Sequence, residues 1–194
     1  MSVSSVPVRD PAEFQARMRT PFATLGIATD GRAVTRVAYL PLAVRESAPA
    51  DAVAERTVRE LARYLDDPSW RFTVPLAPRG TPFQRRAWDA ILAIPAGESR
   101  TYGELARKLV TAARAVGQAC GANPIALIIP CHRVVGSLGA LGGFMGTSGT
   151  FAPSSAGDLF AKAPSPLPAT PADPRFPAAV KRWLLSHEGY RFGR

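Results

Sequence analysis

Residues 101–124 read TYGELARKLVTAARAVGQACGANP and predict two short helices joined by a tight turn. The first helix begins after Thr101, because Thr101 and Glu104 have the spacing of a capping box, in which each side chain accepts a hydrogen bond from a backbone amide of the other residue. The second helix is rich in Ala and Gly around Arg114 and ends at Gly121. Two short helices in this arrangement favour a helix-turn-helix.

Three further segments have the apolar spacing of amphipathic helices. Residues 52–64 place apolar side chains at helical intervals among Arg and Glu. A second helix is expected after Thr81, where Pro82 occupies the first helical position and Thr81 and Gln84 have the spacing of a capping box. The segment FPAAVKRWLLSHEG, residues 176–189, predicts a helix near the end of the chain.

Strands are expected between residues 22 and 41. Two β-branched apolar runs there flank the turn TDGR, and Asp30-Gly31 supplies the positive φ of a hairpin turn. The apolar run IALIIP, residues 125–130, predicts a further, buried strand.

The charge of the chain indicates a polyanionic partner. Its formal net charge is +9. Residues 1–78 carry ten basic and nine acidic side chains, whereas residues 79–194 carry fourteen basic and six acidic ones. Because basic side chains that neutralise phosphates release counterions, this excess favours nucleic-acid binding by the second half of the chain.

Cysteine usage and hydropathy limit the class of protein. The two cysteines, Cys120 and Cys131, form no CxxC pair, so we expect no structural zinc site and no metal. The N-terminal residues lack the apolar core of a signal peptide, and no apolar run reaches the roughly 20 residues needed to cross a bilayer. We therefore expect a cytoplasmic protein without membrane association.

The segment IIPCHRVVGSLGALGGF, residues 128–144, places Cys131 directly before His132. A cysteine chosen at random is most often a small buried apolar residue. This segment, however, resembles the active-site segment of the O6-alkylguanine-DNA alkyltransferases, also called methylated-DNA–protein-cysteine methyltransferases. The motifs TPFQRRAW, TYGELA, ARAVGQACGANP and KRWLLSHEG resemble the same family in the same order. The resemblance covers most of residues 20–194.

The resemblance implies an α/β fold in two domains. An N-terminal α/β domain of ribonuclease H type is expected over residues 1–78, and a mainly helical C-terminal domain with the helix-turn-helix and the active site over residues 79–194. A Pro-rich segment at 147–178 interrupts the resemblance. We expect it to form a flexible loop, because it holds little apolar surface to offset its ordering entropy.

The activity implied by the resemblance is DNA repair by direct, single-turnover alkyl transfer. The alkyl group of O6-alkylguanine, and of O4-alkylthymine, would move irreversibly to Cys131 without a cofactor. The expected partner is double-stranded DNA, bound through the minor groove by a protein monomer.

Four residues carry the chemistry that the resemblance implies. Cys131 matches the nucleophile, and His132 matches a general base that acts through a bound water. Glu188 matches the carboxylate that orients this histidine, and Asn123 matches a hinge residue that supports the site. A nucleophile, a base and a residue that orients the base recur in other covalent catalysts.

Other residues match DNA and substrate contacts of the family. Arg114 matches an arginine that fills the gap left by the flipped nucleotide, and Tyr102 matches a tyrosine that helps to rotate the guanine. Flipping is required because a stacked O6 substituent cannot reach a buried thiol. The remaining DNA-binding residues are small or basic, namely Ala113, Ala115, Gly117 and Arg133. The expected pocket comprises Val134, Val135, Gly142, Gly143, Phe144 and Met145.

Three other functions are alternatives to alkyl transfer. Alkyltransferase-like proteins bind the lesion but replace the nucleophilic cysteine, which this chain retains as Cys131. A regulatory DNA-binding protein would couple alkylation to transcription, and a hydrolytic Cys/His enzyme would need an oxyanion site that the sequence does not reveal. Two departures from the family, a trimmed turn before Arg114 and the Pro-rich segment, leave the range of alkyl groups open.

Overall fold

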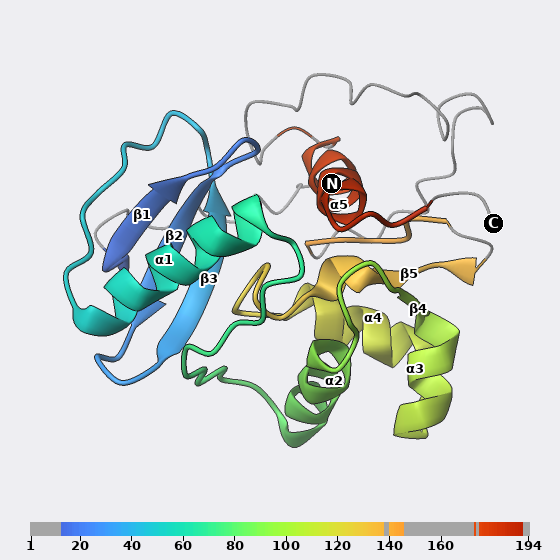
Figure 1. Cartoon of the computed structure of the whole chain (residues 1–194). Helices are drawn as coiled ribbons and strands as arrows, with labels where there is room; N and C mark the ends of the chain where they lie inside the picture. Colours follow the sequence, from blue (N-terminus) through green and yellow to red (C-terminus); the bar gives the residue numbers. More distant parts are fainter. Residues whose placement is uncertain (1–12, 138–139, 146–172, 174, 192–194) are drawn as a thin grey trace, which may run out of the picture.

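The computed structural model describes residues 13–137, 140–145, 173 and 175–191. It has an α/β fold with two small sheets and, within these ranges, five α-helices. Figure 1 shows the larger sheet and its covering helix beside a second part that is mostly helical. The Pro-rich segment lies outside the described residues up to residue 172, so its expected flexibility stays a prediction.

The first part of the fold is an antiparallel sheet covered on one face by a helix. Its strands, β1 (Ala16–Arg19), β2 (Thr24–Thr29) and β3 (Val34–Leu40), pair in sequence order. The hairpin between β2 and β3 is confirmed, with Gly31 at a φ of 81° in the turn. Helix α1 (Ala52–Asp66) packs on the sheet and buries Leu61 and Tyr64.

The second part contains four helices and a short parallel strand pair. The helices are α2 (Pro82–Leu92), α3 (Tyr102–Leu109), α4 (Ala113–Gly121) and α5 (Phe176–His187). Both predicted capping boxes are confirmed, at Thr81 with Gln84 and at Thr101 with Glu104. Strand β4 (Arg100–Thr101) pairs with β5 (Val134–Val135), so the chain after the 3-10 turn η2 (Cys131–Arg133) lies beside the start of α3.

The prediction of a strand over residues 125–130 is wrong, because the backbone there forms turns. Leu127 has a φ of 69°, and the amides of Ile128 and Ile129 bond to the carbonyls of Ala126 and Ile125. Only one bridge joins this segment to the sheet, between Val37 and Ile125. The apolar side chains are nevertheless buried, so the segment is a compact turn inside the core.

The turn between α3 and α4 adopts an unfavourable backbone conformation. Val110 has a φ of 53° and is 91% exposed. A β-branched residue rarely occupies the left-handed region, which Gly and Asn adopt at lower cost. The short turn before Arg114 is therefore closed by Val110 in the left-handed backbone conformation.

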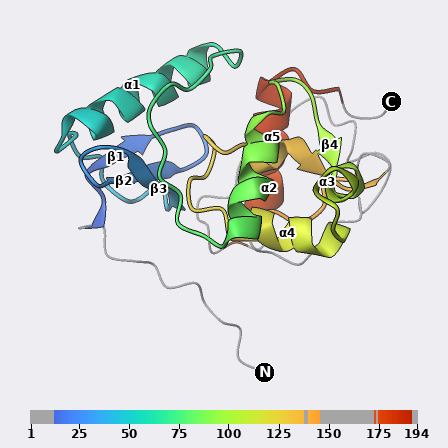
Figure 2. The same cartoon turned by 90° about the horizontal axis from the view of Figure 1, so that it is seen from below.

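One hydrophobic core joins the two parts. The ring of Phe22, before β2, lies 4.8 Å from the ring of Trp183 on α5, and Tyr39 of β3 lies 6.4 Å from Phe176. Figure 2 shows α1 and the three-stranded sheet to one side of the four helices α2, α3, α4 and α5. Helix α5 begins at Phe176, before the predicted loop end at residue 178, because Pro177 fits the first turn of a helix.

Within the described residues, no helix has both the length and the apolar character needed to cross a membrane.

The domain boundary predicted between residues 78 and 79 stays a prediction, since the hydrophobic core is continuous across it.

Candidate active site

Cys131 opens the turn η2 and is held there by Asn123. The cysteine is 5% exposed. The Asn123 side-chain amide donates to Cys131 Sγ at 3.2 Å and to the Ile129 carbonyl at 2.9 Å, while its oxygen accepts from the Ile125 amide at 3.0 Å. Asn123 thus ties the end of α4 to the turn and directs an N–H group at the sulfur.

The surroundings of Cys131 favour the protonated thiol. A hydrogen bond with Cys120 and burial raise the pKa of Cys131, while Asn123 and the positive charge of Lys181 act in the opposite direction. Since the thiolate is the nucleophilic form of cysteine, the site needs a base to take up the thiol proton.

His132 has the tautomer and the charge state expected of such a base. Its ring is 1% exposed, and Nε2 lies 2.9 Å from Glu188 Oε1. Nε2 therefore carries the proton donated to the carboxylate, and Nδ1, which has no hydrogen-bond partner among the described residues, is left as an acceptor. Burial lowers the pKa of His132, so the imidazole is neutral near pH 7.

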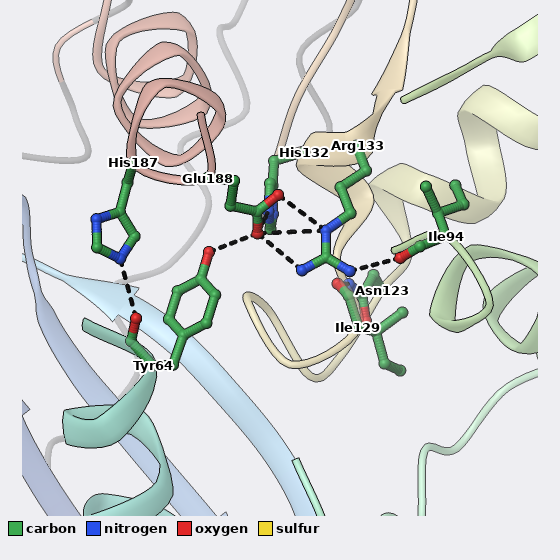
Figure 3. Close-up of polar contacts among 8 residues, drawn as sticks. All are labelled: Tyr64, Ile94, Asn123, Ile129, His132, Arg133, His187 and Glu188. Carbon is green, nitrogen blue, oxygen red and sulfur yellow. Dashed lines mark hydrogen bonds and ion pairs between the residues drawn. The ribbon is translucent and has the colours of Figure 1, made fainter. Parts of the chain in front are cut away.

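Glu188 accepts hydrogen bonds from three side chains, which Figure 3 shows converging on its carboxylate. Besides His132, Tyr64 donates to Oε1 at 2.7 Å, and Arg133 donates to Oε1 at 2.8 Å through Nη2 and to Oε2 at 3.0 Å through Nε. Burial alone would raise the pKa of this carboxyl, but His132 and Arg133 lower it to about 2. Glu188 is therefore a buried anion with three donors.

The DNA contact predicted for Arg133 does not fit this geometry. Its side chain is 12% exposed, and Nη1 donates to the Ile94 carbonyl at 2.5 Å while the rest of the guanidinium binds Glu188. The flat, forked guanidinium is committed to a buried carboxylate and a carbonyl, so Arg133 belongs to the internal network.

A fully buried lysine organises the segment predicted as the substrate pocket. Lys181 Nζ donates to the carbonyls of Val134 at 2.6 Å, of Gly143 at 3.4 Å and of Leu141. The ammonium lies 5.8 Å from the ring centre of Phe144. Burial lowers the pKa of Lys181 to about 8, although Cys120 and Cys131 oppose this shift.

Tyr102 contacts the same segment from the start of α3. Its hydroxyl donates to the Gly143 carbonyl at 2.8 Å, and a Cβ on Gly142 would come within 2.8 Å of its ring. Gly142 also has a φ of 65°, so this position requires glycine twice over. On α4, Gly117 approaches the other side of the ring.

The remaining predicted residues divide between surface and interior. Ala113 and Arg114 are exposed at the start of α4, and Ala115 is partly buried. Among the pocket residues, Val134, Val135 and Phe144 are buried, and Met145 is partly buried with a φ of 54°.

The sequence analysis did not identify Lys181 and Tyr64 as residues of the candidate site. Lys181 lies on the buried stripe of α5 with Leu184, Leu185 and Glu188, and a charged residue at that helical spacing is a signal that the sequence did contain. Tyr64 follows an apolar helical pattern and carried no such signal.

Comparisons with known proteins agree on one family. Residues 82–155 match a family model described as 6-O-methylguanine DNA methyltransferase, DNA binding domain. The chain is 41% identical over 133 residues to a methylated-DNA–protein-cysteine methyltransferase of Mycobacterium tuberculosis, which covers 66% of this chain and 81% of the relative.

Solved structures of proteins from the same bacterium are similar in fold to this chain. The crystal structure of its O6-methylguanine methyltransferase matches with a TM-score of 0.65 and 33% identity, over 89% of this chain and 90% of that one. A crystal structure of its OGT in complex with DNA matches with a TM-score of 0.59 and 40% identity, over 67% of this chain and 83% of that one.

Proposed function

Since the chain belongs to the methylated-DNA–protein-cysteine methyltransferase family and repairs DNA by alkyl transfer, we propose that Cys131 accepts the alkyl group of O6-alkylguanine, and of O4-alkylthymine. The observation that carries this assignment is the buried thiol that accepts a hydrogen bond from Asn123 and lies next in the chain to a neutral His132.

The proposed reaction is an in-line displacement by sulfur. The Cys131 thiol gives its proton, through an intervening water, to His132 Nδ1 as sulfur attacks the O6-alkyl carbon. A carbon–sulfur bond forms, the carbon–O6 bond breaks, and its electron pair leaves with guanine, which takes up a proton. Asn123 and the positive charge of Lys181 stabilise the negative charge that develops on sulfur.

Glu188 holds His132 in the tautomer that this reaction requires. The Nε2–H donated to the carboxylate leaves Nδ1 as the accepting nitrogen. The resulting imidazolium is stabilised by the buried anion, as in other triads of nucleophile, base and carboxylate. The product is a thioether without an activated leaving group, so one protein molecule is consumed for each alkyl group.

DNA binding is assigned to α3 and α4 as a helix-turn-helix that enters the minor groove. The small residues of α4, including Ala113 and Gly117, allow a close backbone approach, and Arg114 is exposed beside them. The first part of the chain is assigned to the ribonuclease H type, and we propose that the protein acts as a monomer. Its two free cysteines fit the reducing cytoplasm.

The direct test is intact-mass spectrometry after incubation with duplex DNA that contains O6-methylguanine. We expect one methyl group per protein molecule, and peptide mapping should locate it on Cys131. An adduct on Cys120, or several turnovers per molecule, would contradict the assignment. Lesion binding without any adduct would favour the alkyltransferase-like alternative.

Arg114→Ala should slow repair of duplex DNA more than reaction with free O6-benzylguanine. The free base needs no extrusion from a stack, whereas a flipped nucleotide costs a few kcal/mol and leaves a gap that Arg114 would fill. We expect roughly a 10- to 100-fold loss on duplex DNA, since each 1.36 kcal/mol is a factor of ten in rate, and a small effect on the free base.

The measurement is the single-turnover rate on both substrates. Arg107→Ala, which removes an exposed arginine of α3, is the matched control for lost charge. Equal losses on both substrates in Arg114→Ala would assign Arg114 to the pocket and not to base flipping.

A further inference from the structure

Tyr64 reaches the candidate active site from the opposite part of the fold. It lies near the end of α1, is 1% exposed, and donates its hydroxyl proton to Glu188 Oε1 at 2.7 Å. In Figure 3 the tyrosine points from α1 directly at the carboxylate, while Arg133 approaches from another side. The helix that packs on the N-terminal sheet thus supplies a donor to the carboxylate that holds His132.

The position of this donor affects which partner Glu188 favours. Oε1 accepts from His132, Tyr64 and Arg133, whereas Oε2 accepts from Arg133. Without the tyrosine hydroxyl, Arg133 is the stronger remaining partner and can draw the carboxylate toward itself. The hydrogen bond from Tyr64 therefore keeps Oε1 within hydrogen-bond distance of His132 Nε2.

The same hydrogen bond also sets the basicity of the pair. A donor to the charged form of a carboxylate makes it a weaker proton acceptor. The other charged or titratable groups facing Glu188 and His132 are Arg133 from η2 and Lys181 from α5. Both are cations, so Tyr64 is the neutral donor of the set.

We propose that Tyr64 is a positioning residue for alkyl transfer, which acts through Glu188 to keep His132 neutral and bonded through Nε2, so that Nδ1 is left to accept a proton. This inference rests on the proposed roles of Cys131, His132 and Glu188. It makes the N-terminal part of the chain a contributor to the chemistry, in addition to its contribution to the common core.

A second hydrogen bond between the same two helices provides a matched comparison. His187 Nε2 lies 2.9 Å from the backbone carbonyl of Tyr64, and the His187 ring stacks on Trp183 at 4.9 Å. Replacing His187 by Phe removes this link between α1 and α5 and keeps an aromatic ring. The change does not touch Glu188.

The experiment compares Tyr64→Phe with His187→Phe in the full-length protein. Single-turnover methyl transfer from duplex DNA is measured from pH 5 to pH 9, together with lesion binding and thermal unfolding. Tyr64→Phe should slow transfer about tenfold at neutral pH, because a hydrogen bond to a buried charged group is lost, with lesion affinity unchanged. The acidic limb of its pH profile should move to higher pH, because a more basic Glu188 stabilises protonated His132.

His187→Phe should lower the unfolding temperature while leaving the pH profile of transfer in place. If Tyr64→Phe and His187→Phe give the same profile as the wild type, Tyr64 is only a structural tie and the inference fails while the proposed function stands. If the wild-type protein forms no adduct on Cys131, the proposed function fails instead.

Discussion

Replacing Cys131 by Ser should abolish alkyl transfer while lesion binding persists. The serine hydroxyl is a far weaker acid than a thiol, so His132 cannot generate the corresponding anion near neutral pH. Oxygen is smaller than sulfur, so serine fits the site, and its hydroxyl can still accept a hydrogen bond from Asn123. The DNA contacts proposed for Arg114 do not depend on the sulfur. We therefore expect an inactive protein with near-normal affinity for the lesion.

The measurements are adduct formation by intact mass and lesion binding by fluorescence anisotropy. Cys120→Ser is the matched control, because it removes the thiol that hydrogen-bonds with Cys131 and keeps the nucleophile. The control should still be alkylated on Cys131. Transfer at the wild-type rate in Cys131→Ser would show that another side chain accepts the alkyl group.

Local signals in the sequence were sufficient to predict most helices and the hairpin. The capping boxes at Thr81 and Thr101 are short-range hydrogen-bond patterns, so residues three apart were enough to place the starts of α2 and α3. Asp30-Gly31 set the hairpin turn in the same way. Strand β1 was missed, because its sequence, ARMR, is only four residues long and has no β-branched or aromatic side chain.

Features that depend on tertiary contacts were predicted less well. Residues 125–130 have the composition of a buried strand, but their burial comes from the surrounding core and their backbone forms turns. Arg133 looked like a DNA contact, since sequence alone could not show that Glu188 and Ile94 enclose it. The contact of Tyr64 with Glu188 joins residues 124 positions apart, and no local pattern encodes it.

Glu188→Gln should both slow transfer and destabilise the fold. The neutral amide leaves Arg133 buried without its counter-ion, and breaking a buried pair in this way typically costs about 3 to 5 kcal/mol. The amide also loses the charge that stabilises protonated His132. The pKa of Glu188 is about 2 in the fold against an ordinary value of 4.5. The ionised Glu188 carboxylate therefore contributes fully to the stability of the fold above about pH 4.5, and this contribution is lost as the pH falls toward 2.

Urea unfolding at pH 7 and at pH 3 measures the loss of stability. The difference in unfolding free energy between wild type and Glu188→Gln should be smaller at pH 3, because the wild-type carboxylate has begun to lose its advantage. An equal difference at both pH values would mean that the stability effect comes from shape and not from the buried charge.

The effect on transfer must be separated from the loss of stability. Glu60→Gln is the matched control, since Glu60 is also a buried carboxylate, with Arg56 and Thr73 as its partners. Both variants should be less stable, and both rates are measured at a temperature where the proteins remain folded. Glu60→Gln should then transfer at the wild-type rate, whereas Glu188→Gln should transfer slowly with lesion binding retained. A wild-type rate in folded Glu188→Gln would remove the carboxylate from the mechanism and leave His132 to act without a partner.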